Sequence, residues 1–315
     1  MCASVAFNRR LSPTYFHLGI AAPGFPPTFR AGEFVMLRPS WVGDPLLPRA
    51  FSIYRVSGGG SDPGSAAAAA PVVEILYKTV GKGTQYLSRM GPGDEVEILG
   101  PLGNAFRMPA GMTTAVLVAG GIGVPPISAL AAEISGGQGS ESRGQGQGNG
   151  YQGSGVRGQG ERLARPETPS EARVFADPRP PTPDPSLEVF LGGRTSEDIL
   201  CAADFEAAGG SVHVATEDGS LGARGLVTDL VQPFLARQGA PGTQVYACGP
   251  AGMLEAVGRL AEALEIPCQL SLEANMACGF GACMGCAVPL RGPEPRYKLC
   301  CKEGPVFEAS EVAWG

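Results

Sequence analysis

The sequence is short of histidine and of charge. Its 315 residues include only two histidines, His17 and His213, and neither lies in a motif typical of catalysis. This argues against a side-chain base acting on a substrate, because histidine does that work most often at neutral pH. Charged residues make up 17% of the chain, the net charge is −6 and no basic run occurs. We therefore expect no nucleic-acid partner.

Long apolar runs are missing as well. The first twenty residues contain no apolar stretch typical of a signal peptide. Nowhere do eighteen apolar residues follow one another without charge, glycine or proline. We therefore expect a soluble, cytoplasmic protein without membrane contact.

Glycine, in contrast, is abundant, with 47 residues, and much of it is concentrated in two segments. Segment 57–71 separates AFSIYRV from VVEILYKTV, whose strand-like character indicates an enlarged hairpin tip. Segment 136–186 is rich in Gly, Gln and Ser and then in Pro. Such a composition buries too little apolar surface to offset the entropy lost on ordering. We expect this segment to be disordered.

Three blocks remain, and they predict an α+β multidomain fold. Residues 1–107 hold short strand-like runs between Gly/Pro turns, typical of an antiparallel β-barrel. Residues 108–265 alternate apolar strands (AVLVAGG, LEVFLGG, SVHVATED, QVYACGP) with helical stretches (PPISALAAEIS, SEDILCAADFEAA, AGMLEAVGRLAEALE), as in a parallel sheet with crossover helices. Residues 266–315 form a small cysteine-rich block. Segment 136–186 follows the first helix of the second block, so it should leave the sheet at the edge opposite the ligand-binding carboxyl edge.

Two parts of the first block could hold a diphosphate. RAFS (49–52) lies in a predicted barrel strand, and LYKTVGKGT (76–84) ends a strand in a glycine-rich turn. Arg49 can supply a bidentate guanidinium, while backbone N–H groups and the Thr84 hydroxyl add donors. An ordinary strand arginine and a hairpin turn would explain each part equally well.

The second block contains a glycine turn between a strand and a helix, VLVAGGIGVPPI (116–127). Its glycines let the backbone approach a diphosphate, and the helix N-terminus favours an anion. The turn is not G-x-G-x-x-G, so the Rossmann fingerprint is absent and a tight structural turn is the alternative. A second turn of interest, YACGPAGMLEAV (246–257), ends the block.

Five of the nine cysteines lie within residues 278–301. A disulfide framework would spread cysteine pairs through a small secreted chain, and zinc would favour a second C-x2-C pair, which is missing. The spacing Cys278-x4-Cys283-x2-Cys286, with a further cysteine at 300 or 301, is the plant-type arrangement for a [2Fe–2S] cluster. The intervening glycines suit a loop that turns tightly around such a cluster.

Together these motifs resemble the ferredoxin-reductase-like flavoproteins. The order of barrel, α/β block and cysteine block resembles, more narrowly, the electron-transfer subunit of the two-subunit, NAD-linked dihydroorotate dehydrogenase (class 1B). The resemblance covers nearly the whole chain apart from the two glycine-rich segments. Its most specific pieces are GKGTQYLSRMGPGDEVEILGPLGNAF, ATEDGSLGARGLVTDL, ACGFGACMGC and YKLCCKEGPVFEASEV.

The resemblance implies the cofactor-binding residues. In that family the strand arginine grips the FAD diphosphate and the serine hydrogen-bonds near flavin N5, and the cysteine before Gly-Pro lies near nicotinamide and flavin. The implied FAD residues are Arg49, Ala50, Phe51, Ser52, Leu76, Tyr77, Lys78, Gly83 and Thr84. The implied NAD residues are Gly120, Gly121, Gly123, Cys248, Gly249 and Pro250. The implied cluster ligands are Cys278, Cys283, Cys286 and Cys301.

The choice of Cys301 over Cys300 rests on alignment with the family at KEGPVF, since spacing alone does not decide it. If this segment is extended, adjacent side chains point to opposite faces. One thiol would then meet the cluster while the other packs into the domain.

The resemblance also implies a division of labour in pyrimidine (UMP) biosynthesis. An FMN-containing catalytic subunit oxidises dihydroorotate, in a heterotetramer with two copies of each subunit. This chain passes the electrons through [2Fe–2S] and FAD to NAD⁺, and the cofactors supply the chemistry. Two alternatives stay open, a self-sufficient NAD(P)H:acceptor oxidoreductase and a redox-sensing regulatory protein. Arg194 stands where an adenosine 2′-phosphate could bind, so the residues alone leave NAD and NADP undecided.

Overall fold

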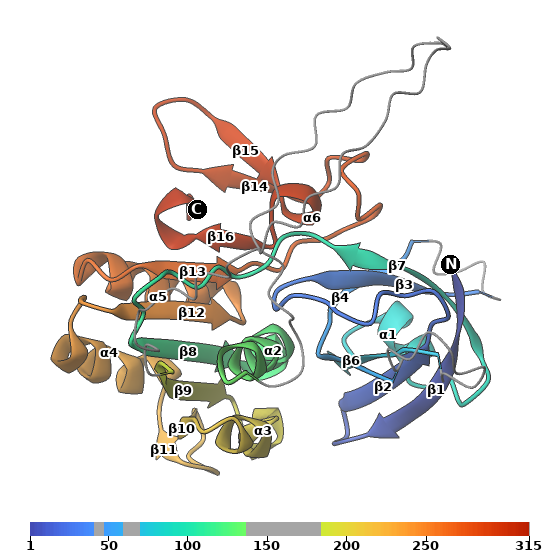
Figure 1. The fold of residues 1–315 in the computed structure, drawn as a ribbon, viewed down its shortest axis with the longest axis horizontal. Helices are drawn as coiled ribbons and strands as arrows, with labels where there is room; N and C mark the ends of the chain where they lie inside the picture. The colour runs from blue at the N-terminus through green and yellow to red at the C-terminus, as the bar shows by residue number, and fades with distance from the viewer. Residues whose placement is uncertain (41–46, 59–69, 137–183, 315) are drawn as a thin grey trace, which may run out of the picture. The chain divides into compact units, whose positions relative to one another are not determined.

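The computed structural model describes residues 1–40, 47–58, 70–136 and 184–314. The disorder expected for 136–186 and the hairpin tip expected for 57–71 fall almost wholly outside these residues. Within the described ranges, no helix is long and apolar enough to span a membrane. Figure 1 shows the arrangement of the helices and strands.

The N-terminal residues form a seven-stranded antiparallel sheet in the order β4-β3-β7-β1-β2-β6-β5. The two edge strands are consecutive in the chain and are joined by Ile53 and Tyr54. Their N–H groups donate to the carbonyls of Glu33 and Glu74, at 3.0 and 2.9 Å. The edges therefore meet at this corner, and the predicted barrel is confirmed. The strands are β1 (Cys2–Arg10), β2 (Tyr15–Ala21), β3 (Phe34–Pro39), β4 (Arg49–Ser52), β5 (Arg55–Ser57), β6 (Val72–Lys78) and β7 (Glu95–Leu102), and helix α1 (Lys82–Leu87) follows β6.

A second seven-stranded sheet has the order β11-β10-β9-β8-β12-β13-β16. All neighbours are parallel except β13 and β16, which confirms the predicted parallel sheet. After β8 the chain adds β9 and β10 on one side of β8, and it later adds β12 on the other side of β8. The strands are β8 (Thr114–Gly120), β9 (Ser186–Gly193), β10 (Ser211–Thr216), β11 (Ala223–Arg224), β12 (Thr243–Cys248), β13 (Cys268–Ser271) and β16 (Val306–Glu308). The carboxyl ends of β8 and β12 thus form a topological switch point, where open α/β sheets bind ligands.

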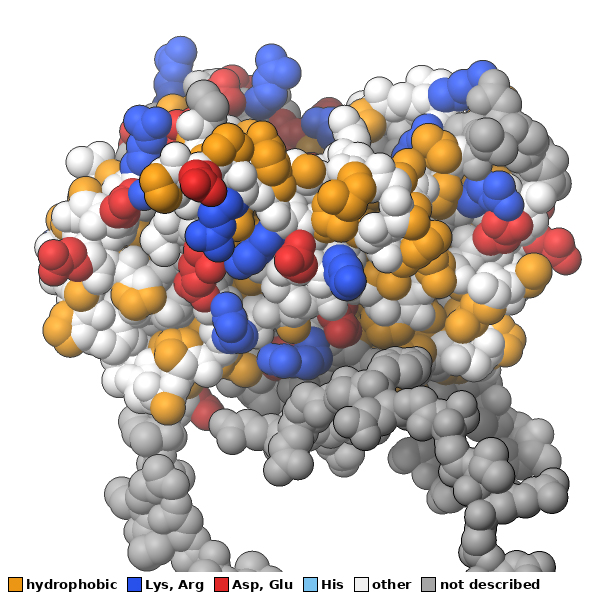
Figure 2. Space-filling view, turned by 90° about the horizontal axis from the view of Figure 1, so that it is seen from above, with side chains coloured by type: hydrophobic (Ala, Val, Ile, Leu, Met, Phe, Trp, Pro, Cys, Tyr) orange, Lys and Arg blue, Asp and Glu red, His pale blue; other side chains and the backbone are white. Residues whose placement is uncertain are grey.

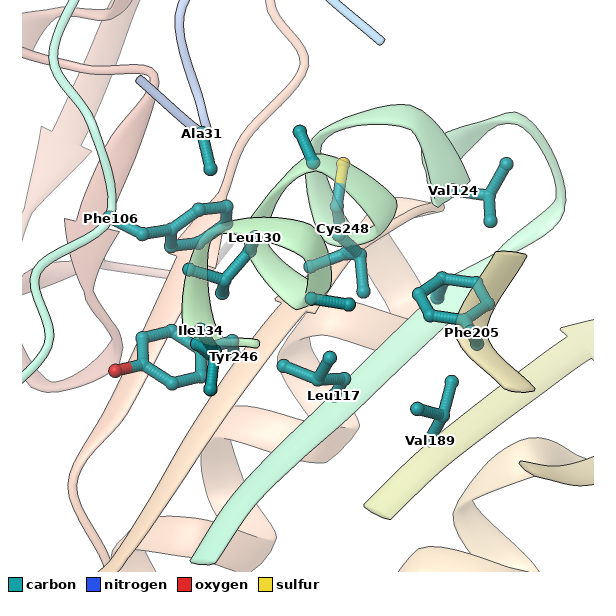
Figure 3. Packing of buried hydrophobic residues seen from close by; sticks show 14 of the residues in the cluster. Ala31, Phe106, Leu117, Val124, Leu130, Ile134, Val189, Phe205, Tyr246 and Cys248 are labelled. Atoms are coloured by element: carbon teal, nitrogen blue, oxygen red, sulfur yellow. The ribbon is translucent and has the colours of Figure 1, made fainter. Parts of the chain in front are cut away.

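Helices cover both faces of this sheet (Figure 1). Helices α2 (Val124–Ile134) and α3 (Ala202–Ala207) contribute to one buried cluster, and α4 (Val227–Gln238) and α5 (Ala251–Ala263) to another. Figure 3 shows the first cluster, in which Leu130 and Ile134 of α2 lie near Phe106 and Tyr246, and Val189 of β9 lies near Phe205 of α3. Phe106, from the segment that leads out of the barrel, packs edge-on against Tyr246, with ring centroids 5.5 Å apart. The barrel exit is thereby fixed to the sheet.

Two helices differ from the sequence-based expectation. SEDILCAADFEAA was expected to be one helix, but it forms the short helix η2 (Ser196–Asp198) and then α3. Cys201 between them has a positive φ of 59°, which an uninterrupted helix does not allow. Helix α4 was not predicted, and Pro233 inside it explains why its pattern was missed.

The C-terminal residues build a smaller unit beside β3. It comprises the hairpin of β14 (Ala287–Leu290) and β15 (Arg296–Leu299), the helical turn α6 (Cys300–Glu303) and η3 (Ala309–Glu311). Cys286, Cys300 and Cys301 are buried here against Phe34 and Met36 of the barrel. Strands β13 and β16, although drawn from residues 266–315, belong to the parallel sheet.

Candidate functional site

The larger of two neighbouring cavities, about 850 Å³, lies against barrel strands β4 and β6. It brings together most of the residues that the resemblance implies for FAD. Those in its wall are Arg49, Ala50, Phe51, Ser52, Leu76, Tyr77, Lys78 and Thr84. Gly83 is not in the wall but lies beside Arg49, since a Cβ at Gly83 would be 3.1 Å from the Arg49 Nε atom.

The turn after β6 is held together by Thr84. Its hydroxyl oxygen accepts hydrogen bonds from the N–H groups of Val80 (2.9 Å) and Gly81 (3.2 Å), and its O–H donates to the Gly81 carbonyl (3.0 Å). The Thr84 hydroxyl proton is therefore already engaged, and the donor role expected for it is not available in this arrangement. Thr84 shapes the turn on which the Arg49 guanidinium rests.

Aromatic side chains form another part of the larger cavity. Phe51 packs edge-on against Tyr77, with ring centroids 5.9 Å apart, and Phe16 stacks on Tyr77 at 5.3 Å. The Tyr77 hydroxyl donates to Asn8 Oδ1 at 3.3 Å. Of these, Phe51 and Tyr77 line the cavity, and aromatic side chains in a cavity wall suit an aromatic ring system such as a flavin.

The smaller cavity, about 560 Å³, lies at the carboxyl ends of β8 and β12. Gly120, Gly121, Gly249 and Pro250 line it, as the sequence suggested for a dinucleotide. Gly123 does not, but a Cβ there would be only 2.3 Å from the Cys248 carbonyl oxygen. Glycine at 123 is thus required for the two turns to meet.

The two cavities share part of their walls. Lys78, Ile122 and Glu273 line both of them, and Cys248 lines the larger one. A group bound in one cavity would therefore lie next to a group bound in the other. The resemblance implied this contiguity, since it places Cys248 near both nicotinamide and flavin.

A carboxylate in the helical turn η2, which follows β9, ties the parallel sheet to the barrel at this shared wall. Asp198 Oδ1 accepts hydrogen bonds from the Tyr15 hydroxyl (2.5 Å) and the Lys78 ammonium (3.0 Å). Burial would raise the pKa of Asp198, but these hydrogen bonds outweigh it and hold that pKa below its usual range. Burial and the bond to Asp198 raise the pKa of Tyr15 to about 12. Asp198 and Lys78 therefore form an ion pair, and the neutral phenol of Tyr15 donates a hydrogen bond to the same carboxylate oxygen.

Sequence reasoning missed Tyr15, Asp198 and Glu273. Asp198 was assigned to an ordinary helix, and Tyr15 was given no role. Neither lies in a recognisable motif, and their partners are more than a hundred residues away in the chain. Nothing in the local sequence signals such a contact.

The cysteine loop borders the larger cavity, whose wall includes Met276, Ala277 and Gly285. Within the loop, backbone N–H groups of Cys283, Phe280 and Ala282 point at the Cys278 sulfur and lower the pKa of its thiol to about 6. Gly279 has a φ of +82°, and a Cβ there would be 2.5 Å from Met36 Cγ. The loop is thus shaped to surround Cys278 with backbone donors while packing closely on the barrel.

Cys300 and Cys301 are oriented differently. The Cys300 thiol donates to the Leu272 carbonyl at 3.4 Å and is fully buried. The Cys301 N–H lies 3.4 Å from Cys286 Sγ. The extended segment assumed from the sequence is wrong, because both residues begin the helical turn α6. Adjacent side chains in a helix point in different directions, as they do in an extended segment. The thiols of Cys300 and Cys301 therefore have different surroundings, as predicted.

The donor set of this loop fits an iron–sulfur cluster chemically. Thiols are the ligands that such clusters use, and backbone N–H groups already directed at sulfur are typical of their surroundings. In the part of the chain that the structure describes, no three of its His, Cys, Asp or Glu side chains are yet gathered at metal-binding distances. Cys283 is exposed, whereas Cys286 and Cys301 are buried.

Large apolar side chains are exposed around the cysteine loop. Phe280 and Met284 are each 62% exposed, and Leu99 of β7 is 44% exposed. Figure 2 shows the molecule of Figure 1 from above. On this face, hydrophobic side chains gather in the middle and on the right. Concentrations of this kind mark surfaces that contact another protein.

Family models and relatives agree with this arrangement. The iron–sulfur cluster binding domain of dihydroorotate dehydrogenase B matches residues 273–313, and the oxidoreductase NAD-binding domain matches residues 171–259. The solved NADH-dependent reduced ferredoxin–NADP oxidoreductase, which works by flavin-based electron bifurcation, is similar with a TM-score of 0.69 and 21% identity. That match covers 99% of this chain and 90% of the other. A ferredoxin NADP⁺ reductase from Neisseria gonorrhoeae, with bound FAD and NADP, matches with a TM-score of 0.56 and 13% identity, over 84% of this chain and 91% of that one.

Similar sequences extend over nearly the whole chain. The dihydroorotate dehydrogenase B (NAD(+)) electron transfer subunit of Bacillus caldolyticus is 33% identical over 98% of this chain and 96% of its own length. The subunit of the same name from Desulforamulus reducens is 30% identical over 96% and 94%. With this identity and coverage, and with the fold and cavities described above, the chain belongs to the family of electron-transfer subunits of NAD-linked dihydroorotate dehydrogenase B.

Proposed function

We propose that this chain takes electrons from a dihydroorotate-oxidising partner subunit and delivers them, through a [2Fe–2S] cluster and FAD, to NAD⁺. The observation that carries the proposal is the continuity of the three sites. The cysteine loop borders the larger cavity, and the larger cavity shares Lys78, Ile122 and Glu273 with the smaller one. Each cofactor would thus lie next to the one with which it exchanges electrons.

The larger cavity is the FAD site in this proposal. Arg49 binds the diphosphate, and Ser52 of the same strand lies in the wall for a hydrogen bond to the flavin. Ala50, Phe51, Leu76 and Tyr77 hold the ring system, and Lys78, Gly83 and Thr84 complete the site. When bound, FAD supplies the exchange between one-electron and two-electron chemistry.

The smaller cavity is the NAD site. The Gly120–Gly121 turn and the Gly249–Pro250 turn let the nucleotide approach the backbone, and Gly123 allows the turns to meet. Cys248, between these turns and the larger cavity, is a small buried side chain that permits close approach of the two rings. Burial raises the pKa of its thiol, so Cys248 acts as a neutral spacer.

Cys278, Cys283, Cys286 and Cys301 are the proposed cluster ligands. The lowered pKa of Cys278 makes its thiolate available at neutral pH, which is the form that binds metal. Cys300, whose thiol is directed to the Leu272 carbonyl, is a packing residue. A cluster held here would lie beside the larger cavity and near the exposed apolar side chains.

The partner in this proposal is an FMN-containing catalytic subunit, with two copies of each chain in a cytoplasmic heterotetramer that serves pyrimidine biosynthesis. The apolar surface around Phe280, Met284 and Leu99 supports such a partner, because electrons enter nearby. No nucleic acid or membrane takes part.

The visible spectrum and cofactor content of the purified chain test the proposal. We expect FAD and a [2Fe–2S] cluster in equal amounts and NADH oxidation with an artificial acceptor. After co-expression, we expect an FMN protein to co-purify in equal amounts and dihydroorotate-dependent NADH formation to require both chains. Full turnover with ferredoxin or quinone by this chain alone would favour the self-sufficient oxidoreductase instead.

A further inference from the structure

Among the described residues, Lys78 is the only cationic side chain that lines both cavities. It ends strand β6 and shares the common wall with Ile122 and Glu273. Burial would lower the pKa of Lys78, but its hydrogen bonds with Tyr15 and Asp198 outweigh burial and raise that pKa. The ammonium is therefore charged at neutral pH, and this charge lies where groups bound in the two cavities would meet.

Asp198 brings a negative charge to the same place from the side of the parallel sheet, in the wall of the smaller cavity. Its Oδ2 atom accepts hydrogen bonds from the N–H groups of Arg194 (3.1 Å) and Thr195 (3.2 Å). These bonds fix the carboxylate on its own turn and leave the Oδ1 atom for the barrel. Asp198 Oδ1 lies 3.0 Å from Lys78 Nζ, so the two side chains together carry no net charge.

Tyr15 holds the ion pair in position. Tyr15 on β2 and Lys78 on β6 lie opposite each other in the barrel, so their side chains are on the same face. Lys78 Nζ lies 4.7 Å from the centroid of the Tyr15 ring, a placement that favours a cation. The Tyr15 hydroxyl donates to the same oxygen of Asp198. The position of the ammonium is thus set by the barrel and by the turn after β9 together.

The charge of the nicotinamide ring gives this ion pair its importance. Resting on the proposed function, NAD⁺ enters the smaller cavity with a cationic ring, and NADH leaves with a neutral one. The ring has to lie next to the flavin to accept hydride, and therefore at the common wall beside Lys78. An unpaired ammonium there would repel the ring of NAD⁺ but not that of NADH. In a partly buried wall, solvent and salt screen such a repulsion only weakly.

We propose that Asp198 determines specificity for the oxidised dinucleotide by supplying the counter-charge of Lys78. With the ion pair intact, the wall accepts the cationic ring of NAD⁺. Without Asp198, the site favours NADH, which is the product in the proposed direction of electron flow. Within the described residues Lys78 forms an ion pair with Asp198 alone. The other charged side chains of the two walls are Arg49, Arg194, Glu217 and Glu273.

Isothermal titration calorimetry on the oxidised, FAD-saturated chain tests this with two dinucleotides. One is NAD⁺, and the other is tetrahydro-NAD, whose ring is uncharged and gives up no hydride. The measured quantity is the Kd for NAD⁺ divided by the Kd for tetrahydro-NAD. We expect Asp198→Asn to raise this ratio fivefold or more, because the ammonium is left unpaired. Lys78→Met should lower the ratio below the wild-type value, because the carboxylate is left unpaired. The double variant should return to within twofold of wild type.

Asp204→Asn is the matched control. Asp204 on α3 also joins the barrel, through a hydrogen bond from Tyr54 and an ion pair with Arg55 at 3.6 Å, but it lies outside both cavity walls. Its variant loses the same charge and a similar contact, so the ratio should stay within twofold of wild type.

Equal weakening of both dinucleotides in Asp198→Asn would overturn the proposal, because it would show a structural role alone. A ratio that rises in Lys78→Met, or that changes in Asp204→Asn as much as in Asp198→Asn, would overturn it as well. Failure of the proposed function would show separately, as a wild-type chain that holds no FAD or binds neither dinucleotide.

Discussion

Replacing Arg49 by alanine should weaken FAD binding while leaving the cluster in place. The guanidinium lies in the wall of the larger cavity, rests against Gly83, and is oriented by its hydrogen bond to the Leu47 carbonyl at 2.7 Å. It is thus already placed to meet an anion.

The size of the effect follows from the type of interaction lost. A charge-assisted hydrogen bond of this type contributes about 1.5–3 kcal/mol. At 1.4 kcal/mol for each factor of ten, the Kd for FAD should rise about 10- to 150-fold. Arg49→Lys keeps the charge but loses the bidentate geometry, so it should fall between wild type and alanine.

Fluorescence titration of FAD into flavin-free protein measures this Kd, and iron and sulfide analysis checks the cluster. Arg55→Ala is a matched control, because Arg55 lies over the Tyr54 ring and pairs with Asp204 outside both cavity walls. A change of less than threefold for Arg49→Ala, or an equal loss in Arg55→Ala, would refute the assignment of Arg49 to the FAD site.

Three further predictions follow from the site. Cys301→Ser should sharply lower iron and sulfide content with FAD and NADH binding intact, whereas Cys300→Ser should keep the cluster; the reverse pattern in iron analysis would make Cys300 the ligand. Asp198→Asn should lower the free energy of unfolding at pH 7 by about 1–3 kcal/mol, because Lys78 loses its ion pair and the amide oxygen offers Tyr15 and Lys78 only a neutral acceptor. Since the folded-state pKa of Asp198 is lowered, its contribution is present above the unfolded value near pH 4 and is lost as pH falls through the folded value. Urea unfolding of both proteins should therefore converge in acid, and a constant difference would contradict the ion pair. Joining Gly136 to Asp184 through a short linker should leave FAD content and NADH oxidation nearly unchanged, because Ser186, two residues after the joint, pairs with Thr114 at the amino end of β8, whereas the smaller cavity lies at the carboxyl end. A tenfold loss of activity in a folded protein would show that 137–183 has a role.

Features that depend on neighbouring residues could be predicted from the amino-acid sequence. The alternation in the first block predicts a barrel, and the strand–helix rhythm predicts a parallel sheet, because each element's burial pattern is written into a few consecutive positions. The C-x4-C-x2-C spacing and the glycine turns are equally local. These features predicted the fold class, the family and the residues now found in both cavity walls.

Contacts between distant parts of the chain could not be predicted in this way and are seen in the folded protein alone. The pairing of Asp198 with Tyr15 and Lys78 spans more than a hundred residues. The different surroundings of Cys300 and Cys301 depend on a helical turn and on the Leu272 carbonyl. Likewise, Glu273 meets both cavities only because β13 lies beside β12 in the sheet. Contacts of this kind leave no periodic signal in the sequence, since each residue's environment is built by segments that come together only when the chain folds.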